Sequence, residues 1–161
     1  MRIAVTGDAP CALAPVRLAI RRALKPYGVP ARAHVGLAFI DDARMRELNR
    51  RHRHKDRTTD VLSFGQALPR RAKGATAARA LRPEVDGSLD LGDIVISAAQ
   101  AGRQAERRGH ALGREIAFLA AHGALHLLGF EDETPAGYRE MVALGTAATD
   151  PRRKAGRDVG H

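Results

Sequence analysis

Two histidines four positions apart are the residues of this sequence best placed to bind a metal ion. His122 and His126 belong to the segment HGALHLLGFEDE, which covers positions 122–133. Side chains four apart on a helix project from one face, about 6 Å apart along the axis, so both imidazoles reach a single ion. Gly129 is typical of a residue that ends a helix and lets the chain turn back toward the pair. The spacing therefore predicts a metal site at the end of this helix.

A third ligand is expected just beyond the glycine, because zinc takes four ligands, or three ligands and one open position. Asp132 is the best-placed candidate, and Glu131 and Glu133 are the alternatives. The alternative without a metal is a histidine pair that arises by chance. Glu115 lies two helical turns before His122; we expect a solvated carboxylate there, the other interpretation being a group that orients a ligand.

The charge of the chain favours an anionic partner. Its 161 residues carry 27 Lys and Arg against 18 Asp and Glu, a formal net charge of +9. This excess favours nucleic acid first and a membrane surface second, although an Arg-rich and Ala-rich composition also arises from genomic base bias. Aromatic residues make up only 4%, which argues against modules that stack RNA bases on an aromatic sheet face. The basic segments 70–82 and 152–157 fit either RNA and ribosome contacts or solvated chain.

Hydrophobic periodicity and turn residues predict one α+β domain. It is a four-stranded mixed sheet covered by about five helices, with the metal site at the end of a central helix. The expected strands cover 1–6, 34–40, 59–64 and 91–96. The expected helices cover 13–24, 43–50, 98–108, 112–128 and a last segment that begins at Glu133 or Thr134 and ends at 148. The domain is expected to span 1–148, followed by a disordered basic tail over 149–161, and residues 65–88 are expected to form a long mobile basic loop.

Several classes of protein are excluded by what the sequence lacks. One cysteine, Cys11, excludes an intramolecular disulfide and a cysteine-rich zinc site, and we expect it to act as a small hydrophobic residue. No apolar run approaches the roughly 20 residues of a membrane span. The first residues lack the features of a signal peptide. We therefore expect a soluble, cytoplasmic protein with no membrane partner.

Three blocks of the sequence, in order, are similar to the motifs of one known family. The helix segment matches the signature His-Gly-x-Leu-His-Leu-x-Gly. The segment LN at 48–49 with HRHKDRTTDVLSF at 52–64 is similar to a Leu-Asn…Tyr-Arg-Gly-Lys-Asp…Thr-Asp-Val-Leu-Ser-Phe block, and LGDIVI at 91–96 is similar to a third. Together the blocks span residues 48–133, about half the chain. The combination resembles the YbeY family of bacterial single-domain endoribonucleases and is specific to it.

The resemblance implies a metal-dependent, single-strand-specific endoribonuclease that acts in rRNA maturation and ribosome quality control. Its expected partners are RNA, especially rRNA, and ribosomal subunits, and its expected cofactor is one zinc or other divalent ion, with no small-molecule cofactor. Arg53 matches the family's functional arginine, whose guanidinium suits a phosphate oxygen. Arg53, His122 and His126 are the expected catalytic residues, and Asp60 and Ser63 are expected to have structural roles.

The sequence departs from the family pattern at sensitive positions. The family's third histidine is Asp132 here, its tyrosine is Phe130, and the glycine of its basic loop is His54. Carboxylate oxygen binds zinc at about 2.0–2.2 Å, so a ligand set of His122, His126 and Asp132 is chemically sound. It also suits harder metals such as manganese.

Two alternatives to the nuclease come from other classes of protein. The first is a non-catalytic ribosome-assembly factor with a structural or lost metal site, an alternative that the missing third histidine leaves open. The less favoured alternative is a zinc peptidase, since two histidines four apart on a helix are also found there. Gly123 stands where a His-Glu-x-x-His peptidase has its general-base glutamate.

Overall fold

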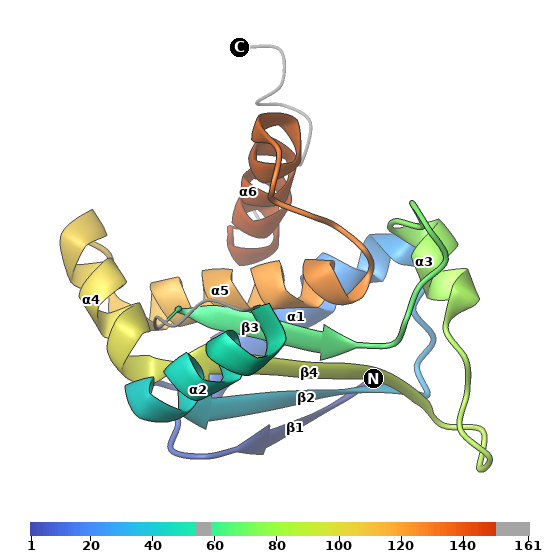
Figure 1. The fold of residues 1–161 in the computed structure, drawn as a ribbon, viewed down its shortest axis with the longest axis horizontal. Coiled ribbons are helices and arrows are strands. Elements are labelled where there is room, and N and C mark those ends of the chain that lie inside the picture. Colours follow the sequence, from blue (N-terminus) through green and yellow to red (C-terminus); the bar gives the residue numbers. More distant parts are fainter. Residues whose placement is uncertain (54–58, 151–161) are drawn as a thin grey trace.

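The structure, a computed structural model, describes residues 1–53 and 59–150 (Figure 1). The four strands are β1 (Arg2–Thr6), β2 (Ala33–Ile40), β3 (Val61–Gly65) and β4 (Leu89–Ser97). The helices are α1 (Leu13–Leu24), α2 (Asp42–Arg53), α3 (Ala75–Ala80), α4 (Ala98–Arg108), α5 (Leu112–Leu127) and α6 (Pro135–Thr149), with a short 3₁₀ turn η1 (Lys25–Tyr27). The expected tail lies almost wholly outside the described residues.

The strands form one mixed sheet in the order β1-β2-β4-β3. Strands β1, β2 and β4 are parallel, and β3 runs antiparallel to β4 at the edge. Strand β2 shows why this sheet forms, because its residues alternate between buried and half-buried along its whole length. Such alternation is typical of a strand with one face on the core. The α+β fold with a four-stranded mixed sheet is thus confirmed.

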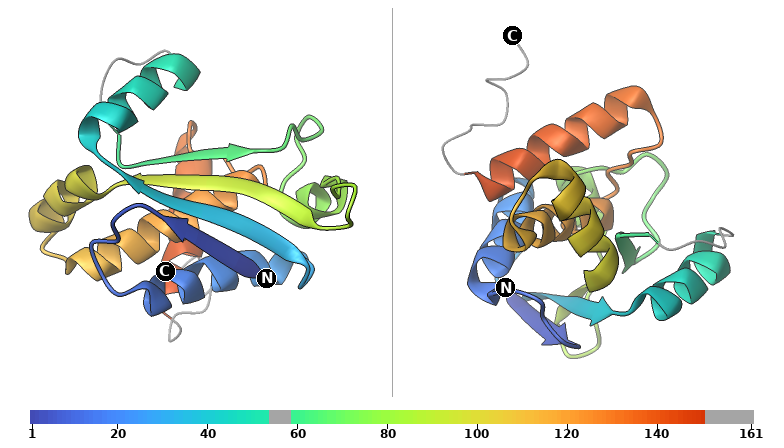
Figure 2. Two further views of the ribbon diagram at one scale, coloured as in Figure 1. Left: turned by 90° about the horizontal axis from the view of Figure 1, so that it is seen from below. Right: turned by 90° about the vertical axis from the view of Figure 1, so that its left-hand side faces the viewer.

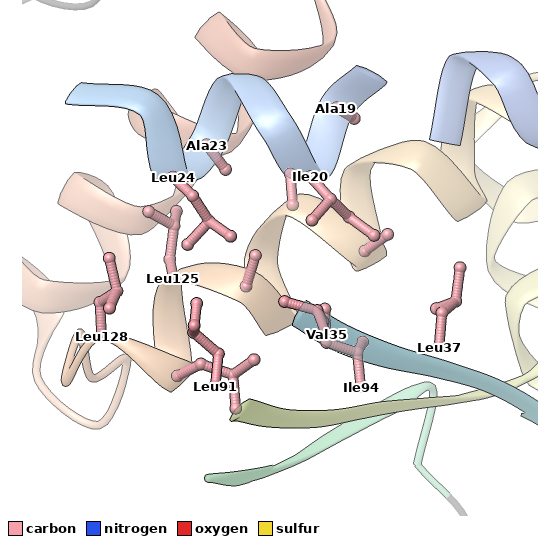
Figure 3. Close-up of a cluster of buried hydrophobic side chains, with 14 of the residues drawn as sticks. Ala19, Ile20, Ala23, Leu24, Val35, Leu37, Leu91, Ile94, Leu125 and Leu128 are labelled. Carbon is pink, nitrogen blue, oxygen red and sulfur yellow. The ribbon is translucent and has the colours of Figure 1, made fainter. Parts of the chain in front are cut away.

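The helices cover the two faces of the sheet unequally. Helix α5 packs on β3 and β4, α1 lies beside α5, and α6 lies across both helices. The two views of Figure 2 show these three helices on one face and α2 on the other. The main core lies between α1, α5 and the sheet, and it includes Ile20, Leu37, Ile94 and Leu125 (Figure 3). Each such side chain contributes about 1.5–3 kcal/mol when fully buried.

A smaller apolar cluster holds α2 on the opposite face. Met45 is fully buried there against Leu62 and Val95. At the end of α2, the ring of His52 packs edge-on against the ring of Phe64 in β3, with centroids 4.8 Å apart. The C-terminal turn of α2 is therefore attached to the edge strand.

Two expectations about local structure are wrong. Residues 65–88 are not a structureless loop, because they contain α3, and Ala77, Ala78 and Leu81 join the main core. A six-residue helix built largely of alanine is too short to show a helical period in the sequence. Helix α2 also continues to Arg53 rather than ending at residue 50. By contrast, Cys11 packs against the core as expected.

Candidate metal centre

Helix α5 and the turn after it build the candidate metal centre. His122 and His126 lie on one face of α5, one turn apart. Gly129 follows with a left-handed φ of +83°. The backbone N–H of the buried Phe130 then donates a hydrogen bond to the carbonyl of Leu125 at 3.2 Å. This turn directs Asp132 back toward the histidines.

The three side chains lie at the spacing of ligands that share one ion. The Nε2 atoms of His122 and His126 are 3.0 and 3.6 Å from Oδ2 of Asp132. Ligands held tetrahedrally about 2.0–2.1 Å from zinc lie about 3.4 Å from one another, and the two distances bracket that value. One candidate ligand atom from each residue lies within 4.8 Å of the others. Glu131 and Glu133 do not belong to this cluster.

A backbone carbonyl orients the second histidine. Nδ1 of His126 lies 2.8 Å from the carbonyl oxygen of Phe130. A carbonyl only accepts hydrogen bonds, so Nδ1 carries the proton and Nε2 presents its lone pair toward Asp132. The sequence could not reveal this partner, because a backbone carbonyl acts regardless of residue type. Nδ1 of the buried His122 has no hydrogen-bond partner among the described residues.

The protonation states of the cluster favour a cation. Burial lowers the pKa of His122 below its usual value, against the opposing effect of Asp132. Burial alone would raise the pKa of Asp132, but the hydrogen bond from His122 and the charges of both histidines outweigh it, and the net pKa is lowered. At neutral pH the site therefore holds one carboxylate and a neutral His122, as a metal requires. Two nitrogens and one oxygen suit zinc, so the residues fit the implied ion.

Strand β3 forms one wall of this site. Ser63 Oγ donates a hydrogen bond to the carbonyl of Gly123, between the two histidines, at 2.9 Å. A Cβ at Gly123 would lie 2.6 Å from Ile94 Cγ2, so only glycine permits this approach. Asp60 accepts hydrogen bonds from Val61 N at 2.8 Å and from Gln104 Nε2 at 2.7 Å. Ser63 and Asp60 thus have the structural roles expected of them.

Arg53 lies apart from the three candidate ligands. It is the last residue of α2, on the other face of the sheet, and its side chain is exposed. The structure brings it near the edge strand through its neighbour His52 but shows no contact with either histidine among the described residues. His54 and residues 55–58 fall outside the described residues. The role of Arg53 in the site stays a prediction.

Glu115 corrects another expectation, since it is buried rather than solvated. Its side chain is only 1% exposed. Oε1 accepts a hydrogen bond from Arg108 Nη1 at 2.9 Å, and Oε2 lies 3.5 Å from Nδ1 of His110. Both partners come from the junction of α4 and α5. Glu115 therefore ties that junction together, two turns away from the candidate ligands.

Removing the arginine of this pair should destabilise the fold. Arg108→Ala leaves the Glu115 carboxylate buried with only His110 beside it, and we expect a loss of about 2 kcal/mol in the free energy of unfolding. In a Glu115→Gln background the same change should cost well under half as much, because no buried charge remains. Urea unfolding of the four proteins in this double-mutant cycle measures the difference. Equal costs in both backgrounds would contradict the assigned pairing.

The fold and site define a single-domain protein with a candidate metal centre at the edge of a mixed sheet. The chain belongs to the Endoribonuclease YbeY family, whose model matches residues 12–150. It is 45% identical over 124 residues to Endoribonuclease YbeY of Moorella thermoacetica, covering 77% of this chain and 76% of that protein. It is 41% identical over 133 residues to Endoribonuclease YbeY of Geobacillus thermodenitrificans, with the same coverage of both.

A solved structure supports the fold alone. The solution structure of TM1509 from Thermotoga maritima matches with a TM-score of 0.56 at 20% identity, covering 91% of this chain and 88% of that one. Among the described residues, no helix is long and apolar enough to cross a membrane.

Proposed function

We propose that this protein is a metal-dependent endoribonuclease that cleaves single-stranded RNA. The observation that carries the proposal is the cluster of His122, His126 and Asp132. The three side chains lie at distances typical of ligands that share one ion, and Asp132 supplies the negative charge that a cation needs. Membership of the Endoribonuclease YbeY family supports the reaction. The net charge of +9 supports a polyanionic substrate.

The proposed division of labour follows from the chemistry of the side chains. The three ligands would hold zinc, which when bound supplies Lewis-acid polarisation of a phosphoryl oxygen. The carbonyl of Phe130 keeps the proton of His126 on Nδ1 and its lone pair on Nε2. Asp132 balances positive charge at the centre. Arg53 would bind a phosphate oxygen and offset charge that develops during cleavage.

The proposed setting is the cytoplasm, with rRNA and ribosomal subunits as partners and no small-molecule cofactor. The support is the family resemblance and the basic composition. One purified sample tests the proposed reaction through two measurements, its metal content and its cleavage of a labelled single-stranded RNA beside the matching duplex. The proposal expects about one metal ion per chain and cleavage of the single strand. Full metal occupancy with no cleavage of either RNA would contradict it.

The non-catalytic assembly factor is favoured by one observation. His122 Nε2 and Asp132 Oδ2 already form a 3.0 Å hydrogen bond, and such a pair is stable without an ion. Ribosome binding with neither metal nor cleavage would establish that alternative. The peptidase has less support, because Gly123 packs too closely on Ile94 for a glutamate at that position.

Arg53 should matter for RNA and little for folding. Arg53→Glu is expected to reduce RNA cleavage by an order of magnitude or more, because a phosphate contact becomes a repulsion. The free energy of unfolding should fall by at most about 1 kcal/mol, the effect of an acidic group at a helix C-terminus. Cleavage kinetics and thermal melting measure the two quantities. The control is Arg44→Glu in the first turn of α2, which should leave cleavage nearly unchanged; a large stability loss in Arg53→Glu with normal cleavage would overturn the assignment.

A further inference from the structure

A cavity of about 750 Å³ opens beside the candidate metal centre, with His126 in its lining. One wall is the turn over residues 69–72, in the connection from β3 to α3. The opposite wall is Thr134 and the first turns of α6, including Glu140. Figure 1 shows this connection at the same end of α5 as the chain leading into α6. Its volume is within the range of sites that bind small ligands or segments of larger ones.

The turn that forms this wall is fixed in place. Ala72 N donates to the carbonyl of Pro69 at 3.0 Å, which closes a tight turn. Gly74 N donates to the carbonyl of Leu128 at 2.9 Å, at the end of α5. The carbonyl of Ala72 approaches Gly129 so closely that a Cβ there would lie 2.2 Å from it. The turn is therefore attached to the helix end that carries His126.

Two arginines of this fixed turn line the cavity. Arg70 and Arg71 are exposed, and neither forms an ion pair or hydrogen bond with any other described residue. Lys73 in the same wall differs, because its Nζ is bound to Glu140 Oε1 at 3.0 Å. The cavity thus presents two guanidinium groups that are free of acidic partners within the described structure.

The backbone of Arg71 strengthens the case for a role. Its φ of +66° makes it the only non-glycine residue with positive φ in the described part of the chain. This is the position of a turn that favours glycine or asparagine, and an L side chain there carries a conformational cost. Residues held in such conformations cluster at ligand-binding positions. A glycine would suit this backbone conformation better, so the presence of arginine here indicates a role for its guanidinium group.

We propose that Arg70 and Arg71 form a phosphate subsite that binds the RNA backbone next to the cleaved phosphodiester. This inference rests on the proposed function. Guanidinium groups bind phosphate oxygens through paired, charge-assisted hydrogen bonds, and such contacts position a strand without reading its bases. The subsite lies on the His126 side of the metal centre, and the rigid turn fixes its distance from that centre.

Arg71→Gly separates this role from a structural one. Glycine suits the left-handed backbone, so the melting temperature should stay within about 3 °C of wild type. With zinc-loaded protein and a single-stranded RNA, KM should rise about 10-fold while kcat changes less than about 2-fold. The slope of log KM against log salt concentration should fall by about 0.7, the value for one lost phosphate contact on a single strand. Arg70→Ala should act in the same direction.

Arg79→Ala is the matched control. Arg79 is an exposed arginine of α3 that does not line the cavity, and its loss changes the net charge by the same amount. It should leave KM and the salt slope at wild-type values. If Arg79→Ala and Arg71→Gly raise KM equally, the effect is one of total charge and the subsite is refuted. If wild type cleaves RNA and Arg71→Gly keeps its KM, the subsite alone fails; if wild type does not cleave RNA, the proposed function fails with it.

Discussion

His122→Ala and His126→Ala proteins are expected to retain less than about a tenth of the zinc that wild type binds. Each change removes one of the three candidate ligands found among the described residues, and two ligands do not hold the ion against water. RNA cleavage should fall in parallel by about 100-fold or more. Elemental analysis after zinc loading and dialysis, with cleavage kinetics on the same samples, measures both. The control is His34→Ala, because His34 pairs with Asp90 on another part of the sheet; wild-type zinc content in His122→Ala would refute the site.

Substitutions of Asp132 test the third candidate ligand. Asp132→Ala should weaken metal binding by roughly 10-fold or more. Asp132→His should retain the metal, because imidazole binds zinc at about 2.0–2.1 Å, close to the carboxylate distance. Glu131→Ala is the control and should bind zinc as wild type does. If Glu131→Ala or Glu133→Ala loses the metal while Asp132→Ala keeps it, the third ligand is misassigned.

Gly129→Ala is expected to lower the free energy of unfolding by about 3 kcal/mol or more. Two costs add. An alanine at φ +83° incurs about 1–2 kcal/mol for the left-handed conformation. Its Cβ would also lie 2.2 Å from the carbonyl oxygen of Ala72, and relieving such overlap costs typically 1–3 kcal/mol. Chemical denaturation measures the loss.

Gly28 provides the matched control for this substitution. Its φ is +77°, but a Cβ there would meet nothing within 4 Å. Gly28→Ala should therefore cost only the conformational part, about 1–2 kcal/mol. Equal losses of unfolding free energy in the two variants would show that the turn containing Ala72 moves away from the new Cβ at little cost. Because Gly129 also directs the chain toward Asp132, the metal content of Gly129→Ala should fall while that of Gly28→Ala does not.

The parts of the fold that sequence predicts well are those with a long, regular pattern. Strand β2 alternates over eight residues, and α5 carries apolar residues at most of its sixteen positions; both form where expected. Helix α3 has six residues, too few for a period. The burial of Glu115 could not be predicted from the sequence for another reason. Its partners Arg108 and His110 lie at the junction of α4 and α5, and no local sequence pattern determines the angle between these two helices.

The candidate site also contains some features that the sequence predicts and others that depend on tertiary packing. His122 and His126 follow from the helical repeat, and Asp132 follows from the turn at Gly129, so these three are within reach of sequence reasoning. The carbonyl of Phe130 is not, since every residue has one. Arg70 and Arg71 appear in the sequence only as part of a basic segment, and their place beside His126 depends on the packing of Ala72 against Gly129.

All three candidate ligands lie within ten positions of one another in the chain, and this has a consequence for assembly. The centre needs one helix and its following turn, and it needs no long-range strand pairing to bring its members together. Such a segment can capture an ion while the sheet is still unformed. An ion that also binds the unfolded chain stabilises the native state by less than its native affinity implies. Metal removal should therefore affect the reaction far more than the melting temperature.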